Sequence, residues 1–288
     1  KVKNYMILID FSQVMLSNIA IQLAITKQKL EIDLVRHMIL NSLRKYRSMF
    51  NEEFGELVIC CDGKDPWRKK IFPSYKANRK KSRESDDKDW DIIFELMSMI
   101  RTEIAENLPY KVIHLDGIEA DDVIAVIVKD HSKWFNQSYM IVSSDKDFKQ
   151  LQKYPNVFQY SPIQKKKIYE DNPKRYIKEH ILIGDTSDGI PNFLSPDDTF
   201  INGIRQQPIN KKKLQYWIDT EPKDFCNEYQ YRNYQRNQRL IDFDFIPEEV
   251  EKRIMDEFKN TKPAPRSNIL PYFTKTKLRN LVGMIQEF

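Results

Sequence analysis

Carboxylates that directly follow short apolar runs are the residues of this sequence best suited to chemistry. Three such runs are rich in Ile, Val, Leu or Met, which is typical of buried strands in a parallel sheet. Because ligands bind beyond the carboxyl ends of such strands, the acids that end them are expected to gather at one edge. Carboxylates gathered in this way repel one another unless cations neutralise them, so the pattern predicts a metal site. The acids are Asp10 after residues 6–9, Asp62 after 57–61, and Asp145 and Asp147 after 139–142.

Two further acidic groups join the strand-ending aspartates. Glu119, Asp121 and Asp122 stand at the entrance of a predicted helix, and Asp185 and Asp188 lie in a turn bounded by glycine. Any one aspartate alone is better explained as a helix N-cap, but capping does not account for the whole ordered set. The set offers only carboxylate oxygens, which suits magnesium, with manganese as its substitute, and argues against zinc. The predicted metal ligands are Asp10, Asp62, Glu119, Asp121, Asp122, Asp145, Asp147, Asp185 and Asp188.

A phosphodiester is the substrate that such a centre suggests, because two divalent ions about 4 Å apart can activate a water and stabilise the leaving oxygen. The distribution of basic residues also favours a phosphodiester substrate. The stretch 64–83, directly after the second acidic strand end, holds nine Lys or Arg residues and a single acid, Asp65. Trp67, Phe72 and Tyr75 are interleaved among them, which favours an element that grips a nucleic-acid strand by stacking on bases and pairing with phosphates. A solvated basic loop is the alternative.

The elements that must position these residues alternate along the first part of the chain and change character after about residue 170. We predict an α/β fold, with a mostly parallel central sheet flanked by helices and a smaller C-terminal all-helical domain. The predicted domains are 1–170, which includes a basic arch region at 64–90, and 171–288. The predicted strands are 6–10, 57–62, 110–116, 139–142 and 156–162. The predicted helices are 11–24, 31–50, 90–108 and 123–134, followed by 173–183, 211–218, 225–240, 247–258 and 275–288.

Composition excludes several classes of protein. No apolar run approaches the roughly 20 residues that a membrane helix requires, and the first residues are unlike a secretory signal. The three cysteines offer neither a disulfide framework nor a CxxC zinc site, so a reducing cytoplasmic setting is expected. The absence of Walker and GxGxxG motifs argues against a nucleotide-cradling loop. The four histidines are interpreted as structural or solvated: His37, His114, His131 and His180.

The acidic motifs occur in a fixed order: Ile9-Asp10, Cys61-Asp62, Glu119-Ala120-Asp121-Asp122, Ser144-Asp145-Lys146-Asp147 and Gly184-Asp185-Thr186-Ser187-Asp188. In this order they resemble the motifs of the flap endonuclease or 5′ nuclease family. Tyr75-Lys76-Ala77-Asn78-Arg79 is similar to the basic arch motif of that family. The likeness extends over nearly the whole chain, through 240–247 to 287–288, and is greatest to the ribonuclease H branch found in T-even bacteriophages.

This resemblance implies a 5′→3′ exonuclease and flap endonuclease with ribonuclease H activity, which removes RNA primers during lagging-strand DNA synthesis. It implies two magnesium ions, with Asp145 and Asp147 between them at the catalytic centre. Lys76 and Arg79 would act with them by steering the scissile phosphate, and Tyr75 would stack on a base. The first ion would be held by Asp10, Asp62, Glu119, Asp121 and Asp122, and the second by Asp185 and Asp188.

The same resemblance implies partners. The substrates would be DNA and RNA–DNA hybrids with a 5′ end or flap, and analogy adds a sliding clamp and a single-strand DNA-binding protein. The chain would act as a monomer, without a membrane, in the host cell cytoplasm if phage-encoded. The family has a Gly-rich helix-hairpin-helix turn after its last aspartates, which residues 190–198 lack, so the lysines from 211 to 213 are expected to take over part of its role. The predicted nucleic-acid contacts are Arg68, Tyr75, Lys76, Arg79, Lys80, Lys81, Lys211, Lys212 and Lys213.

Two other functions remain open at this point. A haloacid-dehalogenase-like phosphatase also places Asp at a strand end, but it needs a second Asp two residues later, where this sequence has Ser12. A non-catalytic module that binds branched DNA would leave the acids as solvated caps. Incubation of a 5′-labelled flap with and without magnesium separates the three functions.

Overall fold

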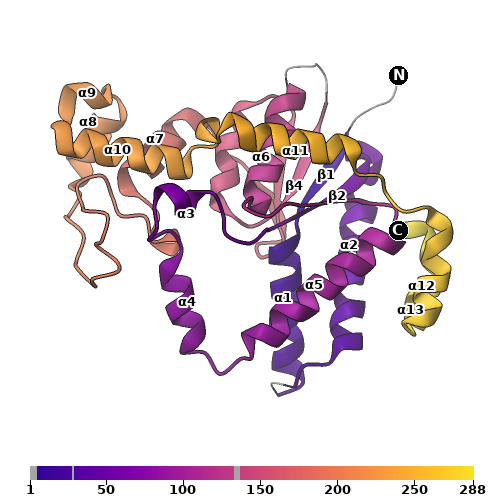
Figure 1. Ribbon diagram of the computed structural model, residues 1–288. Helices are drawn as coiled ribbons and strands as arrows, with labels where there is room; N and C mark the ends of the chain where they lie inside the picture. The colour runs from indigo at the N-terminus through magenta and orange to yellow at the C-terminus, as the bar shows by residue number, and fades with distance from the viewer. Residues whose placement is uncertain (1–4, 28, 133–136) are drawn as a thin grey trace.

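The computed structural model describes residues 5–27, 29–132 and 137–288, and it is built around a six-stranded sheet (Figure 1). The strands lie side by side in the order β3-β2-β1-β4-β5-β6. All neighbours are parallel except β6, which is antiparallel to β5, so the predicted mostly parallel sheet is confirmed. β6 was not among the predicted strands, because its three residues are too few to give a period. The strands are β1 (Met6–Asp10), β2 (Glu56–Cys61), β3 (Lys111–His114), β4 (Tyr139–Val142), β5 (Val157–Ser161) and β6 (Lys166–Ile168).

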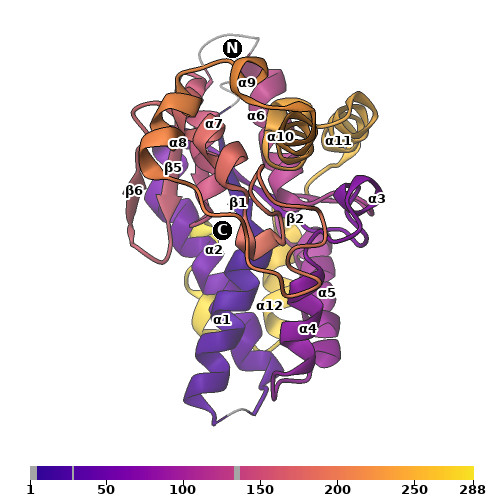
Figure 2. The same cartoon turned by 90° about the vertical axis from the view of Figure 1, so that its left-hand side faces the viewer.

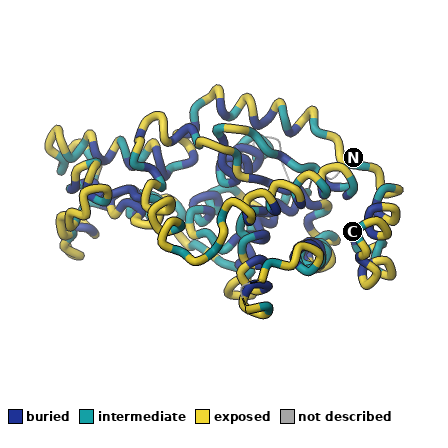
Figure 3. Tube along the Cα trace, turned by 60° about the horizontal axis from the view of Figure 1, so that its bottom comes forward, coloured by how far each residue is buried: buried dark blue, intermediate teal, exposed yellow. Residues whose placement is uncertain are grey.

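Helices cover both faces of the sheet because successive side chains of a strand point to opposite sides. Ile7 and Ile9 of β1 pack in the core beneath α1 (Phe11–Ile25), α2 (Ile32–Phe54) and α5 (Trp90–Asn107). Leu8 points the other way, into the core beneath α6 (Ala120–Ser132) and α11 (Glu248–Asn260). Figure 3 shows the buried residues concentrated in the middle of the molecule, with exposed residues on the outer sides of the helices. The predicted helix end at 133–134 lies outside the described residues.

The second half of the chain divides into two parts. Helices α7 (Pro173–Ile183), α8 (Lys211–Ile218), α9 (Pro222–Phe225) and α10 (Glu228–Ile241) surround a small core of their own, at the left of Figure 1. Beyond them, α11 packs against the α6 side of the sheet. The end of the chain returns to the opposite face, where Phe273 and Phe288 are fully buried. It contains η4 (Arg266–Asn268), α12 (Ile269–Lys275), α13 (Arg279–Val282) and η5 (Ile285–Glu287).

The C-terminal part is all-helical, as predicted, but its last third packs on both faces of the sheet and completes the α/β layers. An amphipathic helix shows in sequence that it has a buried face, but not which surface covers that face. The predicted helix at 275–288 is likewise replaced by shorter segments. No helix in the described ranges is long and apolar enough to cross a membrane.

The basic region after β2 forms an open V beside the sheet. Its first segments are α3 (Arg68–Ile71) and α4 (Ala77–Glu84), and the chain then turns back into α5 (Figure 1). Seen from the side, the two arms of the V lie nearly one behind the other (Figure 2). Helix α4 has no buried residue, so it stands clear of the core. We call residues 68–84 the arch segment.

Candidate active site

The aspartates predicted to end strands do meet at one edge of the sheet, because β1 has β2 on one side and β4 on the other. At such a switch point the loops after neighbouring strands diverge and leave room for a ligand. Asp10 is both the last residue of β1 and the N-cap of α1, and its Oδ1 accepts from the Gln13 amide at 3.4 Å. The Ser143 hydroxyl, just after β4, donates to Oδ2 of Asp10 at 2.8 Å, so these two strand ends are tied together.

The acids that follow β2 and β3 reach the same edge. The Ala120 amide, in the first turn of α6, donates to Oδ1 of Asp62 at 2.8 Å and so fixes the start of α6 against the end of β2. Asp121 follows in that turn. Asp145 caps the 3-10 helix η1 (Lys146–Lys153), because its Oδ1 accepts from the amide two residues on at 2.9 Å. We call Asp10, Asp62, Asp121 and Asp145 the strand-end cluster.

Burial and repulsion between carboxylates both disfavour negative charge in the strand-end cluster. Burial, the carboxylate of Asp62 and that of Asp145 raise the pKa of Asp10 to about 7. Burial, Asp145 and Asp10 raise the pKa of Asp121 well above its usual range. The donors that these carboxylates meet are a hydroxyl and backbone amides rather than cationic side chains. The cluster therefore holds negative charge that the chain itself does not neutralise, as a divalent cation site requires.

Glu119 and Asp188, in contrast, are paired with cations from the arch segment. Lys76 Nζ lies 2.5 Å from Glu119 and 3.6 Å from Asp188, and Arg79 lies 2.5 Å from Asp188. Although burial acts to raise it, Lys76 and Arg68 hold the pKa of Glu119 at about 2. Burial raises the pKa of Asp188 even though Lys76 and Arg79 act to lower it.

Asp185 is held in the same way by its own neighbours. Lys146 Nζ lies 2.9 Å from its Oδ2, and the Ser187 amide donates to its Oδ1 at 2.8 Å. Burial acts to raise the pKa of Asp185, but His180, Ser187 and Lys146 together hold that pKa well below its usual range. We call Glu119, Asp185 and Asp188 the clamped cluster.

Two residues predicted to touch nucleic acid are buried in this network instead. Arg68, 3% exposed, donates to Asp122 at 2.8 Å and to Glu119 at 2.9 Å. Tyr75, also 3% exposed, donates its hydroxyl to Glu119 at 3.0 Å. In this structure both side chains are paired with carboxylates, so the nucleic-acid contact of Arg68 and the base stacking of Tyr75 stay predictions. The physical reason is that a buried carboxylate must be paired and hydrogen-bonded, and these side chains meet that need.

Asp122 also lies away from the predicted metal edge. Its carboxylate is fully buried, accepts from Arg68 on both oxygens and accepts from Trp67 Nε1 at 3.0 Å. Its oxygens are thus already used to fix the base of the arch segment to α6. We do not keep Asp122 among the proposed ligands. A sequence pattern places neighbouring acids on one helix turn but does not tell which way each one points.

The remaining predicted contacts divide into two groups. Lys76 and Arg79 lie at the clamped cluster, and Lys76 has the left-handed φ of 56°, held by its amide donating to the Asp188 carbonyl at 2.8 Å. The other basic residues are exposed on helices α4 and α8, away from the carboxylates. They are Lys80, Lys81, Lys211, Lys212 and Lys213.

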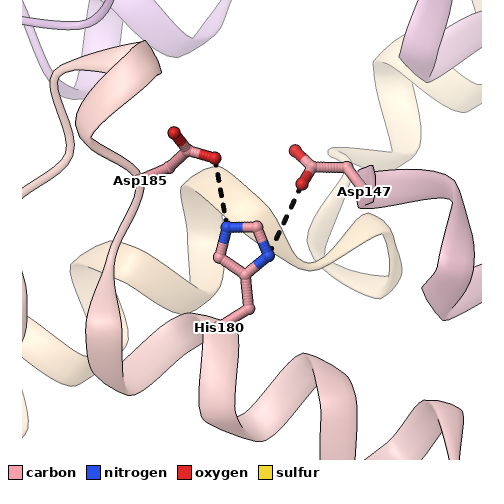
Figure 4. Close-up of side chains that lie close together, drawn as sticks. All are labelled: Asp147, His180 and Asp185. Carbon is pink, nitrogen blue, oxygen red and sulfur yellow. Dashed lines mark hydrogen bonds and ion pairs between the residues drawn. The ribbon is translucent and has the colours of Figure 1, made fainter. Parts of the chain in front are cut away.

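One histidine that we interpreted from the sequence as structural or solvated lies at the site. His180, near the end of α7, stands between Asp147 and Asp185 (Figure 4). Its Nε2 is 3.1 Å from Oδ2 of Asp185, and its Nδ1 is 3.5 Å from Oδ1 of Asp147. Burial and Asp145 raise the pKa of Asp147 to about 7, against the opposing effect of His180. One ligand atom from each of the three residues lies within 4.8 Å of the others, a spacing that suits a metal ion.

The side chains present fit a cation. Oδ1 of Asp147 is buried and has no hydrogen-bond partner among the described residues, although a buried carboxylate oxygen without one costs free energy. Asp121, Asp147, Asp185 and Asp188 also line one small pocket, so both clusters face a common space. A hard divalent ion would satisfy these oxygens.

The stretch after Asp188 differs from a regular helical hairpin. Residues 190–210 consist of turns and extended segments that lead to α8. Gly184 and Gly189 begin this stretch with positive φ values of 75° and 71°. A Cβ at Gly184 would lie 2.5 Å from the Ile190 carbonyl oxygen, so only glycine allows the turn that returns Asp185 to the site.

Comparison with known proteins identifies the family of this chain. Residues 6–180 match the model of the 5′-3′ exonuclease N-terminal resolvase-like domain, and residues 172–288 match the model of the T4 RNase H C-terminal domain. The chain belongs to the 5′-3′ exonuclease family. It is therefore a nuclease, which excludes both the phosphatase and the non-catalytic binding module.

Relatives of this 5′-3′ exonuclease family member agree with the match. A ribonuclease H of Enterobacteria phage T4 is 35% identical over 291 residues, covering 98% of this chain and 95% of that protein. A 5′-3′ exonuclease of Buchnera aphidicola subsp. Acyrthosiphon pisum (strain APS) is 29% identical and covers 52% of this chain and 51% of its own length. The resemblance to the phage ribonuclease H branch is thus confirmed.

Solved structures of phage T5 proteins share the fold. The T5 D15 protein co-crystallised with metal ions has a TM-score of 0.64 at 15% identity, covering 88% of this chain and 98% of its own. The T5 D15 flap endonuclease in a pseudo-enzyme-product complex with DNA and metal ions has a TM-score of 0.61, with the same identity and coverage. These similarities confirm that the sheet, its flanking helices and the helical C-terminal part form the architecture of a flap endonuclease.

Proposed function

We propose that this exonuclease-family chain is a magnesium-dependent 5′→3′ nuclease that hydrolyses phosphodiesters at the 5′ ends and flaps of RNA–DNA and DNA–DNA duplexes. Its role would be primer removal during lagging-strand DNA replication. The observation that carries the proposal is the strand-end cluster, which brings four carboxylates from four segments to the switch point of the sheet. The raised pKa values of Asp10 and Asp121 support it, because unneutralised carboxylates in such a place require cations.

Two ions are proposed at this edge. Asp10, Asp62, Asp121 and Asp145 would hold one ion, and Asp147 with Asp185 would hold the other, with Glu119 and Asp188 nearby. When bound, the ions would supply the Lewis acidity that activates the attacking water and stabilises the leaving oxygen. Magnesium suits the oxygen ligands, and manganese can replace it.

The arch segment would bring the phosphate to this centre. Lys76 and Arg79 are paired with carboxylates, and a phosphate that enters the site offers them an alternative partner of the same charge. Each cation can then move from carboxylate to phosphate without leaving a charge unpaired, provided that a metal ion takes over the carboxylate. The single strand would lie beside α4, where Lys80 and Lys81 are exposed. Strand separation is needed because a phosphate held in a duplex does not reach both ions.

The substrate class rests on relatives. The T5 flap endonuclease relative was solved with DNA, and the T4 relative is named ribonuclease H, which supports DNA and RNA–DNA hybrids as substrates here. The exposed lysines at the start of α8 would contact duplex phosphates. The proposal extends to a sliding clamp and a single-strand DNA-binding protein as partners, and to a monomer that works in the cytoplasm of a host cell.

A single assay tests this function. A 5′-labelled flap is incubated with the protein in EDTA and in excess magnesium, and the products are separated by size. We expect short labelled oligonucleotides with magnesium and none in EDTA. Release of the end label alone, or a shifted band without cleavage, would contradict the proposal.

A second arm of the assay tests strand capture. A flap with a free 5′ end is compared with one whose end carries a streptavidin block added before the enzyme. We expect the block to suppress cleavage strongly. Equal cleavage of both flaps would rule out capture of a free end and leave the arch segment as an ordinary duplex-binding patch. Replacement of the DNA flap by RNA of the same sequence measures the substrate preference in the same experiment.

A further inference from the structure

Unlike the acids and the permanent cations described at the centre, His180 can offer a nitrogen lone pair to a metal ion. It lies on α7, only 7% exposed, with one ring nitrogen facing Asp185 and the other facing Asp147 (Figure 4). The predicted ligand set contained no nitrogen, and no sequence pattern joined this histidine to it. Its position between Asp147 and Asp185 is a reason to add it to that set.

Hydrogen bonding alone leaves this arrangement incomplete. A neutral imidazole carries one N–H donor and one lone pair, so it can donate to only one of the two carboxylates. The other nitrogen then directs its lone pair toward a second carboxylate oxygen, where repulsion is expected. Oδ1 of Asp147, 3.5 Å from Nδ1, is buried without a hydrogen-bond partner in the described ranges. A cation that accepts the lone pair and both carboxylates removes the conflict.

The fold holds the imidazole in this orientation. Tyr176, one helical turn earlier on α7, packs edge-on against the ring at 5.8 Å and donates its hydroxyl to the Lys146 carbonyl at 3.0 Å. Its hydroxyl is thereby used elsewhere, although it lies 3.5 Å from Nδ1. The turn at Gly184 then returns the chain so that Asp185 faces the ring. A ring nitrogen that keeps its N–H toward a carboxylate is the arrangement that usually orients a ligating histidine.

We propose that His180 is a nitrogen ligand of the second ion, together with Asp147 and Asp185. This inference rests on the metal centre of the proposed function and goes beyond it by giving the two sites different metal preferences. The strand-end cluster offers oxygen ligands alone, which suits magnesium. An imidazole in the second site favours a first-row transition metal such as manganese over magnesium, because magnesium prefers oxygen ligands and retains its waters.

The decisive measurement is electron spin echo envelope modulation on the full chain loaded with Mn²⁺. A coordinated imidazole imposes nitrogen modulation on the manganese signal, and oxygen ligands do not. We expect nitrogen modulation in the wild-type protein and a changed pattern when its histidines carry ¹⁵N. We expect His180→Asn to remove the modulation, and His37→Asn, a histidine of α2 on the far side of the sheet, to keep it.

The affinity for Mn²⁺ and Mg²⁺ provides a second test of His180 as a ligand. In equilibrium dialysis, His180→Asn should weaken Mn²⁺ binding at the second site about tenfold or more and change Mg²⁺ binding less. His180→Asp should restore an oxygen ligand, so that the ion binds without nitrogen modulation and the preference shifts toward Mg²⁺. This second variant keeps the inference testable if the asparagine variant folds poorly, and wild-type protein labelled with ¹⁵N-histidine needs no variant.

The outcomes separate this inference from the proposed function. Two Mn²⁺ ions bound with only oxygen ligands would overturn the role of His180 and leave the nuclease proposal standing. Nitrogen modulation that persists in His180→Asn would do the same. Failure of the wild-type chain to bind Mn²⁺ at all would overturn the metal-dependent function and, with it, this inference.

Discussion

The strand-end cluster and the clamped cluster hold similar numbers of carboxylates but solve the problem of their charge in opposite ways. In the strand-end cluster the pKa of Asp10 rises to about 7, because burial and neighbouring acids disfavour its charged form. In the clamped cluster the pKa of Glu119 falls to about 2, because Lys76 and Arg68 outweigh the effect of burial. One cluster has to obtain its cations from solution, and the other already has them from the chain.

The origin of the cations explains the difference. The strand-end carboxylates come from the sheet edge and the start of α6, and the hydrogen bonds that they accept from described residues come from a hydroxyl and backbone amides. Glu119 and Asp188 face the arch segment, whose Lys76 and Arg79 reach them from outside the core, and Asp185 is paired with Lys146. We infer that Lys76 and Arg79 neutralise Glu119 and Asp188 until the substrate binds. The two cations then pair with the phosphate, and metal ions take their place at the carboxylates. The strand-end cluster would then hold the first ion, Asp185 would help to hold the second, and Glu119 and Asp188 would couple the arch segment to this centre.

The largest loss of cleavage rate is expected when one charge is removed from the strand-end cluster. This change tests whether that cluster differs from the clamped cluster in the way described. Asp145→Asn keeps the shape of the side chain and its cap on η1, so the fold and DNA binding should persist. We expect the single-turnover cleavage rate of a flap to fall about a thousandfold or more, which corresponds to ~4 kcal/mol of transition-state stabilisation. The rate is measured with saturating enzyme, and a thermal melt checks the fold. A variant that cleaves at the wild-type rate would remove Asp145 from the metal centre.

The coupling between arch and carboxylates is tested by Lys76→Ala. Its effect should fall mainly on chemistry, because Lys76 is expected to contact the phosphate fully only in the transition state. We expect the single-turnover rate to drop about tenfold to hundredfold, or ~1.4–2.7 kcal/mol, with a much smaller change in DNA affinity.

Lys80→Ala is the matched control for this experiment, since Lys80 lies on the same arch segment but its side chain is 83% exposed and, among the described residues, pairs with Glu84 alone. That variant should change affinity slightly and leave the chemical rate alone. Equal losses of rate in both variants would mean that general positive charge on α4, rather than the contact of Lys76 with the clamped cluster, is what matters.

A pH titration without metal sharpens the comparison further. The pKa of Asp10 is raised from 3.8 to about 7, so its proton is bound more tightly in the folded state, and stability is lost as pH rises from about 4 to 7. The pKa of Glu119 is lowered from 4.5 to about 2, so its contribution is present above pH 4.5 and is lost only as pH falls toward 2. Between pH 5 and 7.5 the strand-end cluster and Asp147, whose pKa is also raised to about 7, should therefore give a slope, and Glu119 should not.

We expect the free energy of unfolding in EDTA to decrease by ~2 kcal/mol between pH 5 and 7.5 on account of the strand-end cluster. Urea denaturation followed by circular dichroism measures it. Asp10→Asn should flatten the slope, and comparison with the wild type cancels the histidines, which both proteins share. A saturating divalent ion should have the same flattening effect. An unchanged slope in the variant would contradict the assignment of repulsion to Asp10.

The strand-end cluster was predictable from sequence, and most of the clamped cluster was not. Asp10, Asp62 and Asp145 end apolar runs, and parallel strands bring their carboxyl ends together whatever their helices do. Arg68 and Tyr75 looked like surface residues because a basic, aromatic stretch is usually solvated. Their burial depends on Glu119 and Asp122, whose directions are set by the packing of α6 rather than by any local pattern.

The position of His180 at the site could not be predicted from the sequence, for a related reason. A single histidine on an amphipathic helix carries no pattern, and its neighbours Asp147 and Asp185 come from two other segments. The return of the C-terminal helices to the sheet is a similar case, since Phe288 and Phe273 show only that they are apolar. In both cases the missing information is which surfaces of the chain meet.

The smallest expected effect on catalysis lies far from both clusters, in the lysines that begin α8. Changing Lys211, Lys212 and Lys213 together to Ala removes exposed charges and no described core contact. If each contacts a duplex phosphate, the slope of log affinity against log salt should flatten by about 0.9 per lost contact. The cleavage rate at saturating substrate should stay near the wild-type value, because neither cluster is touched. The same change at 165–167, a lysine run at the edge strand β6, is the matched control for charge. An equal flattening in both triple variants would show that the salt slope reports net charge alone and that α8 is no dedicated duplex contact. A fall in the saturated rate would mean instead that α8 helps to place the scissile phosphate, and the separation of binding from chemistry drawn from the two clusters would fail.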